Sequence, residues 1–192
     1  MEDTLSEVFT QCWGKLLYGS LINDNAFHTG VLGTQGEGSI GMRTVVLRAV
    51  KPDEKQLVFY TDKRSSKMTD LTAVPFANWL FYDGSERVQV KLLGNTIIHH
   101  MDEVSQSHWQ KVNGDARKLY MAVPAPSTST DYPTDGLEHL NSGSNTEDAY
   151  LNFAVVITTV DFIEWLSLKK DGHRRAQFKL IDGSWKGQWI IP

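Results

Sequence analysis

The sequence predicts a mainly β fold, in which short antiparallel strands close into a barrel and helices are inserted between them. Roughly eight segments are short and rich in β-branched and aromatic residues, as is typical of strands. Short polar turns separate several of them, which favours antiparallel pairing. Closing such a sheet into a barrel removes its open edges. The chain has 192 residues, which suits one domain over 1–192.

The first half of the chain is predicted to be one helix followed by strands. Apolar residues recur at three- and four-residue spacing over 4–18, which indicates an amphipathic helix. The polar loop 51–54 is predicted to connect its two flanking strands as a β-hairpin. Residues 62–73 are helix-compatible, and Pro75 ends that helix. Strands are expected over Phe27 to Leu32, Met42 to Val50, Gln56 to Thr61, Phe76 to Tyr82 and Arg87 to Ile98.

The second half is predicted to begin with helix and end with strands. Val104 to Tyr120 reads as helical, in two pieces broken near Asn113-Gly114. The segment 124–148 is rich in Ser, Thr, Pro, Gly, Asn and Asp, and a loop of this length is usually functional or disordered. Strands are expected over Asn152 to Val160, Phe162 to Leu168, Ala176 to Ile181 and Trp185 to Ile190. Trp79, Trp185 and Trp189 are expected in the core.

Composition and charge exclude several classes of protein. The formal net charge is −4, without the basic footprint of a general nucleic-acid binder. No apolar run approaches the ~18 residues of a membrane span, and the N-terminus lacks the features of a signal peptide. The single cysteine, Cys12, excludes an internal disulfide and fits a reducing compartment. We therefore expect a cytoplasmic protein without nucleic-acid or membrane partners.

Two weak patterns are better explained by ordinary structure. Gly33, Gly36 and Gly38 lack the spacing of a dinucleotide-binding loop and lie between strands, so we interpret them as a hairpin turn. His99-His100 ends a strand without a third ligand at a recognisable spacing, so no metal site is expected. Nucleophile motifs of hydrolases are also missing from the sequence.

A basic segment, Arg64 to Lys67, joins the end of a strand to the start of a helix. Amide N–H groups at a helix N-terminus, two hydroxyls and two cations suit a phosphate, although a solvated charged loop explains the segment about as well. Arg43 and Arg48 flank one strand and point to opposite faces, so one could face a ligand and the other a partner subunit. Two edge-strand arginines in water are the alternative.

Taken in chain order, these pieces resemble the pyridoxamine 5′-phosphate oxidase superfamily of FMN-binding split barrels. The resemblance runs from about Phe27 to Pro192 and is nearest to its cyanobacterial and plant branch. The matching pieces are the Arg43 to Arg48 strand, Phe59-Tyr60-Thr61, Ser65 to Lys67, the Arg87 to Gly94 strand, Trp165, His173-x-Arg175 and a final tryptophan-bearing strand that ends in proline.

The resemblance implies a split-barrel homodimer with two FMN sites at the subunit interface. The flavin would lie along Arg43, Thr44, Val45, Val46, Leu47 and Arg48. Its phosphate and ribityl chain would be held by Tyr60, Thr61, Ser66 and Lys67, with Ser65 beside them. Gln89 would hydrogen-bond the ring edge, and Trp165 and Arg175 would come from the second subunit. Arg175 would lie near N1 and C2=O, and His173 and Arg175 are the candidates for a catalytic role.

Three departures from the family pattern distinguish the binding of FMN from the catalysis of the family's vitamin-B6 reaction. Authentic pyridoxamine phosphate oxidases carry arginines where this chain has Val123 and Asp171, and a substrate-binding lysine where it has Arg48. The resemblance thus implies FMN binding without the vitamin-B6 reaction. A flavin-dependent oxidoreductase of unknown substrate is the favoured function. The alternatives are a non-catalytic flavin-binding or sensing protein, a true pyridoxamine phosphate oxidase, and a split barrel that binds haem or another cofactor.

Overall fold

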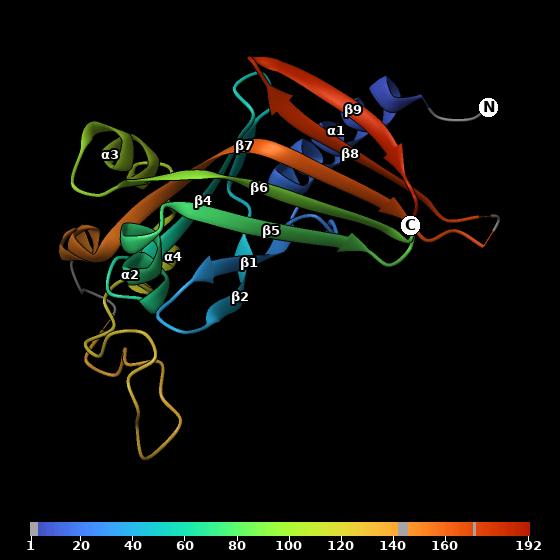
Figure 1. Cartoon of the computed structure of the whole chain (residues 1–192). Helices are drawn as coiled ribbons and strands as arrows, with labels where there is room; N and C mark the ends of the chain where they lie inside the picture. The colour runs from blue at the N-terminus through green and yellow to red at the C-terminus, as the bar shows by residue number, and fades with distance from the viewer. Residues whose placement is uncertain (1–3, 142–145, 171) are drawn as a thin grey trace.

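Antiparallel strands dominate the fold, as predicted. The computed structural model describes residues 4–141, 146–170 and 172–192 (Figure 1). Its strands are β1 (Thr29–Gln35), β2 (Ile40–Val46), β3 (Ala49–Lys51), β4 (Gln56–Asp62), β5 (Phe76–Asp83), β6 (Val88–His99), β7 (Phe153–Ser167), β8 (Arg174–Ile181) and β9 (Ser184–Ile190). Within the described residues they form one sheet in the order β2-β1-β5-β6-β7-β4-β3, and β8 pairs with both β7 and β9.

Strand β7 is the element that splits the sheet. One of its edges pairs with β6 along nearly the whole strand, whereas the other pairs first with β4 and then with β8. The register shifts near Asp161, where β6 passes from Gly94 to Leu93. The prediction of two strands here, 152–160 and 162–168, was wrong, because a bulge lets one strand absorb the extra residue.

The segment predicted as one strand over 42–50 is two strands. The Leu47 amide donates to the carbonyl of His28 at 2.8 Å, and the Arg48 amide donates to that of Val58 at 2.8 Å. The chain therefore leaves its partner β1 and joins β4 between these two residues. The hairpin with β4 is confirmed, but β3 forms it and β2 pairs with β1.

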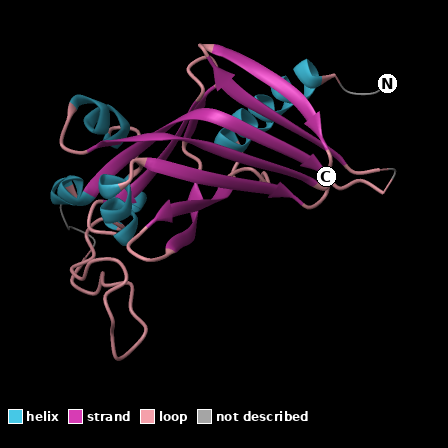
Figure 2. Ribbon diagram, in the orientation of Figure 1, coloured by secondary structure: helices cyan, strands magenta, loops and turns pink. Residues whose placement is uncertain are grey.

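The helices are α1 (Leu5–Leu21), α2 (Ser66–Ala73), α3 (Glu103–Trp109), α4 (Gly114–Lys118) and the 3₁₀ helix η1 (Glu147–Asn152). A capping box of Thr4 and Glu7 starts α1, which runs beyond the predicted end at residue 18. Asn113 caps α4, so the predicted break in the 104–120 helix is confirmed. Figure 2 shows α2, α3, α4 and η1 gathered at one end of the long strands. Residues 119–141 and 146 lie outside any helix or strand. Among the described helices, none has the length and apolar character that a membrane crossing requires.

The main core lies between α1 and the inner face of the sheet. Trp79 is buried there, and its Nε1 donates to the Thr158 hydroxyl at 3.1 Å. Trp185 is half-buried against Phe9, but Trp189 is 44% exposed, so the prediction of a core position is wrong for Trp189. Its strand, β9, pairs only with β8 and lies at the end of the sheet. A second, smaller cluster around Phe153 lies between the outer face of β4 and β7 and the short helices.

Replacing Gly94 by alanine is expected to destabilise the protein by about 3 kcal/mol. A Cβ atom at this position would collide with the carbonyl oxygen of Thr159, and backbone cannot move aside cheaply. Urea denaturation measures the change. Gly14→Ala is the matched control, because its added methyl meets no atom within 4 Å and lies on the exposed side of α1. That change should stabilise by up to ~1 kcal/mol, and similar losses for both variants would contradict the close approach at Gly94.

Candidate functional site

A lysine and two hydroxyls converge where β4 leads into α2. The Lys67 Nζ donates to Thr61 Oγ1 at 3.0 Å and to Ser65 Oγ at 2.9 Å, and the two hydroxyl oxygens lie 3.2 Å apart. Thr61 and Ser65 are buried and Lys67 is half-buried. We call these three residues the β4–α2 cluster. It places a cation and two hydroxyls at the N-terminus of a helix.

The β4–α2 cluster lacks the negative charge that its lysine requires. Burial lowers the pKa of Lys67, and repulsion from Arg43 lowers it further, while Asp62 and Asp70 act in the opposite direction. Lys67 forms no ion pair with a described residue within 4 Å. The side chain of the N-cap residue Ser65 makes no capping hydrogen bond, so the amides of Ser66 and Lys67 remain available to a ligand, whereas that of Met68 donates to the Ser65 carbonyl. A phosphate would supply the missing charge, so the residues present fit that part of FMN.

A second cation, Arg43, is held beside α2. Its Nη1 donates to the Thr34 hydroxyl and, at 2.9 Å, to the carbonyl of Gly41. Its Nη2 lies 3.6 Å from the Asp70 carboxylate, which also accepts from Thr34 at 2.6 Å. Strands β1 and β2 and helix α2 together therefore fix this guanidinium. Ser66, the first residue of α2, is exposed and can offer its hydroxyl and amide at the same end.

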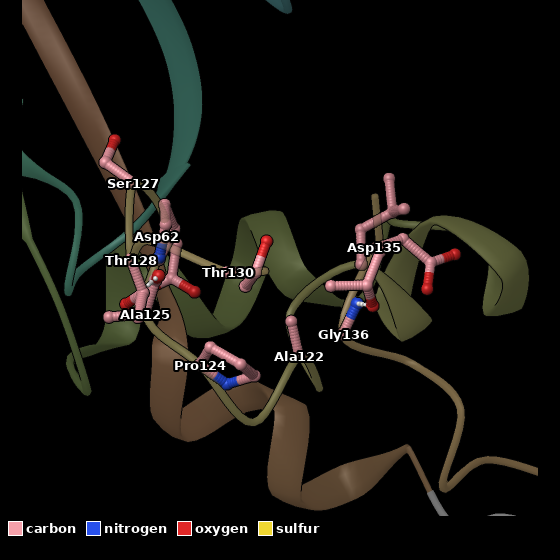
Figure 3. Close-up of a pocket in the computed structure, with 12 residues that line it drawn as sticks. Asp62, Ala122, Pro124, Ala125, Ser127, Thr128, Thr130, Asp135 and Gly136 are labelled. Atoms are coloured by element: carbon pink, nitrogen blue, oxygen red, sulfur yellow. Dashed lines mark hydrogen bonds between the residues drawn. The ribbon is translucent and has the colours of Figure 1, made fainter. Parts of the chain in front are cut away.

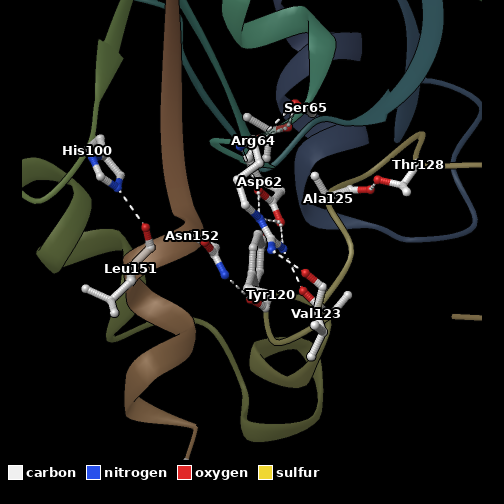
Figure 4. Close-up of polar contacts among 12 residues, drawn as sticks. Asp62, Arg64, Ser65, His100, Tyr120, Val123, Ala125, Thr128, Leu151 and Asn152 are labelled. Carbon is white, nitrogen blue, oxygen red and sulfur yellow. Dashed lines mark hydrogen bonds and ion pairs between the residues drawn. The ribbon is translucent and has the colours of Figure 1, made fainter. Parts of the chain in front are cut away.

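Arg64 does not belong to the β4–α2 cluster. Its Nε and Nη2 bind the two oxygens of Asp62 at 3.0 and 2.7 Å. Its Nη2 and Nη1 also donate to the carbonyls of Ala122 and Val123 at 2.9 and 3.3 Å (Figure 4). The expectation of a phosphate-binding or solvated Arg64 is therefore not met. The Arg64 side chain is neutralised by Asp62. Through Ala122 and Val123 it also ties the long loop that begins after α4, at residue 119, to the end of β4.

Tyr60 lies on the opposite face of β4 from Thr61, because consecutive strand residues alternate, and Arg48 contacts its ring. The Tyr60 hydroxyl is 2.9 Å from His108 Nδ1, and the Arg48 guanidinium lies 5.8 Å from the centroid of the Tyr60 ring. Burial raises the pKa of Tyr60 and lowers that of His108, so it favours the neutral form of both groups in this contact. The structure thus separates Tyr60 from Lys67, with which the resemblance groups it.

The segment 43–48 offers a ligand mainly its backbone. Strand β2 is the last strand on its side of the sheet, so the outer edge of its backbone has no neighbouring strand. Thr44 is exposed, Val45 and Val46 are half-buried, and the Leu47 side chain is fully buried in the core. A planar ring could lie along this edge, but the Leu47 side chain could not contact it.

The remaining predicted residues form a C-terminal cluster of Gln89, Trp165 and Arg175. Leu166 of β7 pairs with Gln89 on one side and with Arg175 on the other. The Trp165 ring is buried on the other face, 6.3 Å from the Trp189 ring. Arg175 Nη2 lies 2.8 Å from Glu164 Oε1, and its buried Nε has no hydrogen-bond partner. A cavity of about 350 Å³ adjoins this cluster, lined by His173, Arg174, Arg175, Trp189 and residues 190–192.

The two clusters lie at opposite ends of the long strands. Asp62, next to Thr61, pairs with Phe153 at the start of β7, whereas the C-terminal cluster flanks Leu166 near its end. At ~3.3 Å per residue, this length of strand spans about 40 Å. Figure 1 shows α2 at one end of the sheet and the chain's C-terminus at the other. One small cofactor cannot contact both clusters of the same chain.

A second cavity, of about 280 Å³, lies against the end of β4 (Figure 3). We call it the loop cavity. The long loop supplies most of its walls, including the hydroxyls of Ser127, Thr128 and Thr130 and the carboxylate of Asp135, and Asp62 completes it. Among the described residues that line it there is no lysine, arginine or histidine. The loop cavity is therefore polar and lacks a cation that could hold a phosphate.

Comparison with known proteins identifies the class to which these features belong. Residues 11–100 match the model of the family described as pyridoxamine 5′-phosphate oxidase, FMN-binding domain. Over these residues, just under half of the chain, the protein matches an FMN-binding family, and this match supports FMN as the cofactor. The matched residues include the 43–48 segment, the β4–α2 cluster and Gln89, but not Trp165 or Arg175.

Individual relatives agree with this assignment. A pyridoxine/pyridoxamine 5′-phosphate oxidase of Synechocystis sp. is 27% identical over 164 residues, which cover 81% of this chain and 74% of that protein. A solved pyridoxamine 5′-phosphate oxidase-related, FMN-binding protein of Nostoc punctiforme has a TM-score of 0.79 at 23% identity, with both chains fully covered. PhzG of Burkholderia lata, solved with tetrahydrophenazine-1-carboxylic acid, has a TM-score of 0.75 at 15% identity over 96% of this chain and 92% of that one. These structures confirm the split-barrel fold.

Several residues that shape the two clusters were missed by sequence reasoning. Asp70 anchors Arg43, His108 binds Tyr60, and Glu164 pairs with Arg175. Each is far along the chain or on another strand, and no local motif marks it. No group of three or more His, Cys, Asp or Glu side chains in the described part of the chain is arranged to hold a metal ion.

Proposed function

We propose that this protein is a flavin-dependent oxidoreductase that acts as a homodimer with an FMN site at each end of the subunit interface. The observation that carries the proposal is the half-buried Lys67 ammonium, which is held by two hydroxyls at a helix N-terminus with no carboxylate of a described residue within 4 Å. When bound, FMN supplies the hydride or electron chemistry. The protein binds the cofactor, orients it and holds the substrate beside it.

The phosphate is assigned to the β4–α2 cluster and the ring to the edge of β2. Lys67, Thr61, Ser65 and the first amides of α2, including that of Ser66, would hold the phosphate, with Arg43 as the second cation. The ring would lie along the backbone of 44–48. Charge-assisted donors suit the phosphate, and an apolar wall with a few polar groups suits the ring.

The distance between the two clusters supports the dimer. A site that uses both must take them from two chains, so Gln89 is assigned to the second subunit together with Trp165 and Arg175. The outer face of the sheet, which carries Gln89 and Arg175, also presents apolar side chains to solvent. Ile40 is 72% exposed, Met42 68% and Tyr82 50%. Such a face favours burial against a second copy.

A pyridoxamine phosphate oxidase is the second candidate function, favoured by the Synechocystis relative. The loop cavity argues against it. Val123 offers no cation, and Arg64, the guanidinium beside it, is neutralised by Asp62. Asp171, the other departure, lies outside the described residues. Turnover of pyridoxamine 5′-phosphate comparable to that of an authentic oxidase would establish the second candidate and refute the expected loss of the vitamin-B6 reaction.

A non-catalytic flavin-binding role is the remaining alternative, since His173 is exposed and the Glu164 carboxylate beside the C-terminal cluster is paired with Arg175. The proposed location is cytoplasmic, which the buried, unpaired Cys12 supports. Measured turnover with any electron donor and acceptor pair distinguishes the oxidoreductase from the flavin-binding alternative.

Saturating FMN is expected to raise the melting temperature of the apo-protein. A ligand that binds only the native state stabilises it by about 2.7 kcal/mol at a concentration of 100 Kd. For a chain of this size that corresponds to roughly 5–10 °C. Differential scanning fluorimetry with FMN, and with free phosphate as the control, measures the shift. An unchanged melting temperature under saturating FMN would refute FMN binding.

A further inference from the structure

We propose that Glu164 is a positioning residue that orients Arg175. By partly neutralising the positive charge of Arg175, it also lowers the reduction potential of bound FMN. This inference rests on the proposed function, because it takes Arg175 as a residue of the FMN site. Glu164 lies next to Trp165 on β7, outside the residues 11–100 that match the family model.

The geometry ties Arg175 to Glu164. Arg175 Nη2 lies 2.8 Å from Glu164 Oε1, and the two side chains are 32% and 11% exposed. Their residues are diagonal neighbours on one face of the sheet, since β7 pairs Leu166 with Arg175 and Glu164 with Gln177. A carboxylate this well buried on a rigid strand fixes the guanidinium more firmly than an exposed partner would.

The rest of the guanidinium is available for a ligand. Arg175 Nε is buried and has no hydrogen-bond partner among the residues that the structure describes. A buried donor of this kind is costly unless something satisfies it. Arg175 also lines the 350 Å³ cavity of the C-terminal cluster and shares the outer face with Gln89. The arginine therefore uses Nη2 to bind Glu164, while Nη1, the other terminal nitrogen, bonds no described residue and faces an acceptor that arrives from a second subunit.

The pair has a definite electrostatic consequence. A cation beside N1 and C2=O favours the reduced, anionic form of the flavin and raises its potential. A carboxylate in contact with that cation opposes the effect, because the two charges act on the ring from nearly the same place. Glu164 therefore sets a lower potential than Arg175 alone would, while its hydrogen bond keeps the guanidinium in place.

The test is the midpoint potential and FMN affinity of Glu164→Gln. Glutamine keeps the acceptor oxygen and removes the charge. The affinity for reduced FMN relative to oxidised FMN is expected to rise about tenfold, which is about +30 mV for a two-electron couple. Glu164→Asp keeps the charge and should retain a potential near that of the wild type. Glu54→Gln is the matched control for net charge, because it removes a carboxylate from an exposed pair with Lys51, and it should leave the potential unchanged.

Arg175→Gln separates failure of this inference from failure of the proposed site. If Arg175→Gln weakens FMN binding but Glu164→Gln leaves the potential unchanged or lowers it, the role of Glu164 is refuted and the FMN site stands. If Arg175→Gln changes neither affinity nor potential, Arg175 is not in the FMN site and the inference fails with that assignment. A rise in potential for Glu164→Gln alone, with Glu164→Asp near wild type, supports the inference.

Discussion

Lys67→Ala is expected to weaken FMN binding about 100-fold and riboflavin binding less than about threefold. Removing the charged partner of a buried anion typically costs about 2–5 kcal/mol, and only FMN carries the phosphate. The Lys67 ammonium is held between Thr61 and Ser65, whereas Arg43 is already bound by Thr34, Gly41 and Asp70, so Arg43 does not replace it fully. Fluorescence titration of the apo-protein with each flavin gives both dissociation constants.

Lys63→Ala is the matched control for Lys67→Ala. Both variants lose one lysine from the same connection between β4 and α2, but Lys63 is exposed. Its removal should change FMN affinity by less than about threefold, because exposed charges are screened by solvent. Equal losses for FMN and riboflavin in Lys67→Ala would remove the lysine from the phosphate site. Equal losses for FMN in both variants would point to general charge instead of the β4–α2 cluster.

A heterodimer of one Lys67→Ala chain and one Arg175→Ala chain is expected to bind one FMN tightly per dimer. In a site shared between subunits, the β4–α2 cluster of one chain meets the C-terminal cluster of the other. One of the two sites then carries both substitutions and the other carries neither. Co-expression with two affinity tags isolates the mixed dimer, and flavin absorbance after gel filtration gives about half an FMN per chain.

The two parent variants make this measurement decisive. Each homodimer has one substitution in both sites, so both are expected to lose most of their bound FMN during gel filtration. If each chain instead built a complete site by itself, the mixed dimer would behave like its parents and retain little FMN. A monomeric wild-type protein that binds FMN tightly would also contradict the shared site.

The sequence predicted the strands and their order well, because their alternation and turn residues are local signals. The predicted strand boundaries were wrong where the pairing of one strand with another determined where a strand begins or ends. The bulge at Asp161 merges two predicted strands because β6 continues along the same edge of β7. The predicted strand 42–50 is divided between Leu47 and Arg48. The Leu47 amide donates to the His28 carbonyl just before β1, whereas the Arg48 amide donates to the Val58 carbonyl of β4. Both events depend on contacts with residues far along the chain, which no local pattern encodes.

The candidate site shows the same division at the level of single side chains. Lys67 and its neighbours could be singled out because a basic segment with hydroxyls at a helix start is a recognisable pattern. That Arg64 turns away to Asp62, while Lys67 turns toward Thr61, depends on the position of the loop at residues 122–123. Tyr60 and Thr61 are adjacent in the motif, yet strand alternation directs them to opposite faces.

The amino-acid sequence by itself determined the class of this protein: its antiparallel strands, its resemblance to an FMN-binding family and the basic start of α2. Composition, periodicity and the order of short motifs are properties of the chain before it folds. Only the tertiary structure decided that the predicted cofactor residues form two clusters at opposite ends of β7, because that separation follows from the pairing along this strand. The same pairing brought Glu164 to Arg175 and left the Arg175 Nε without a partner, so the charge at the proposed site is a property of the folded sheet.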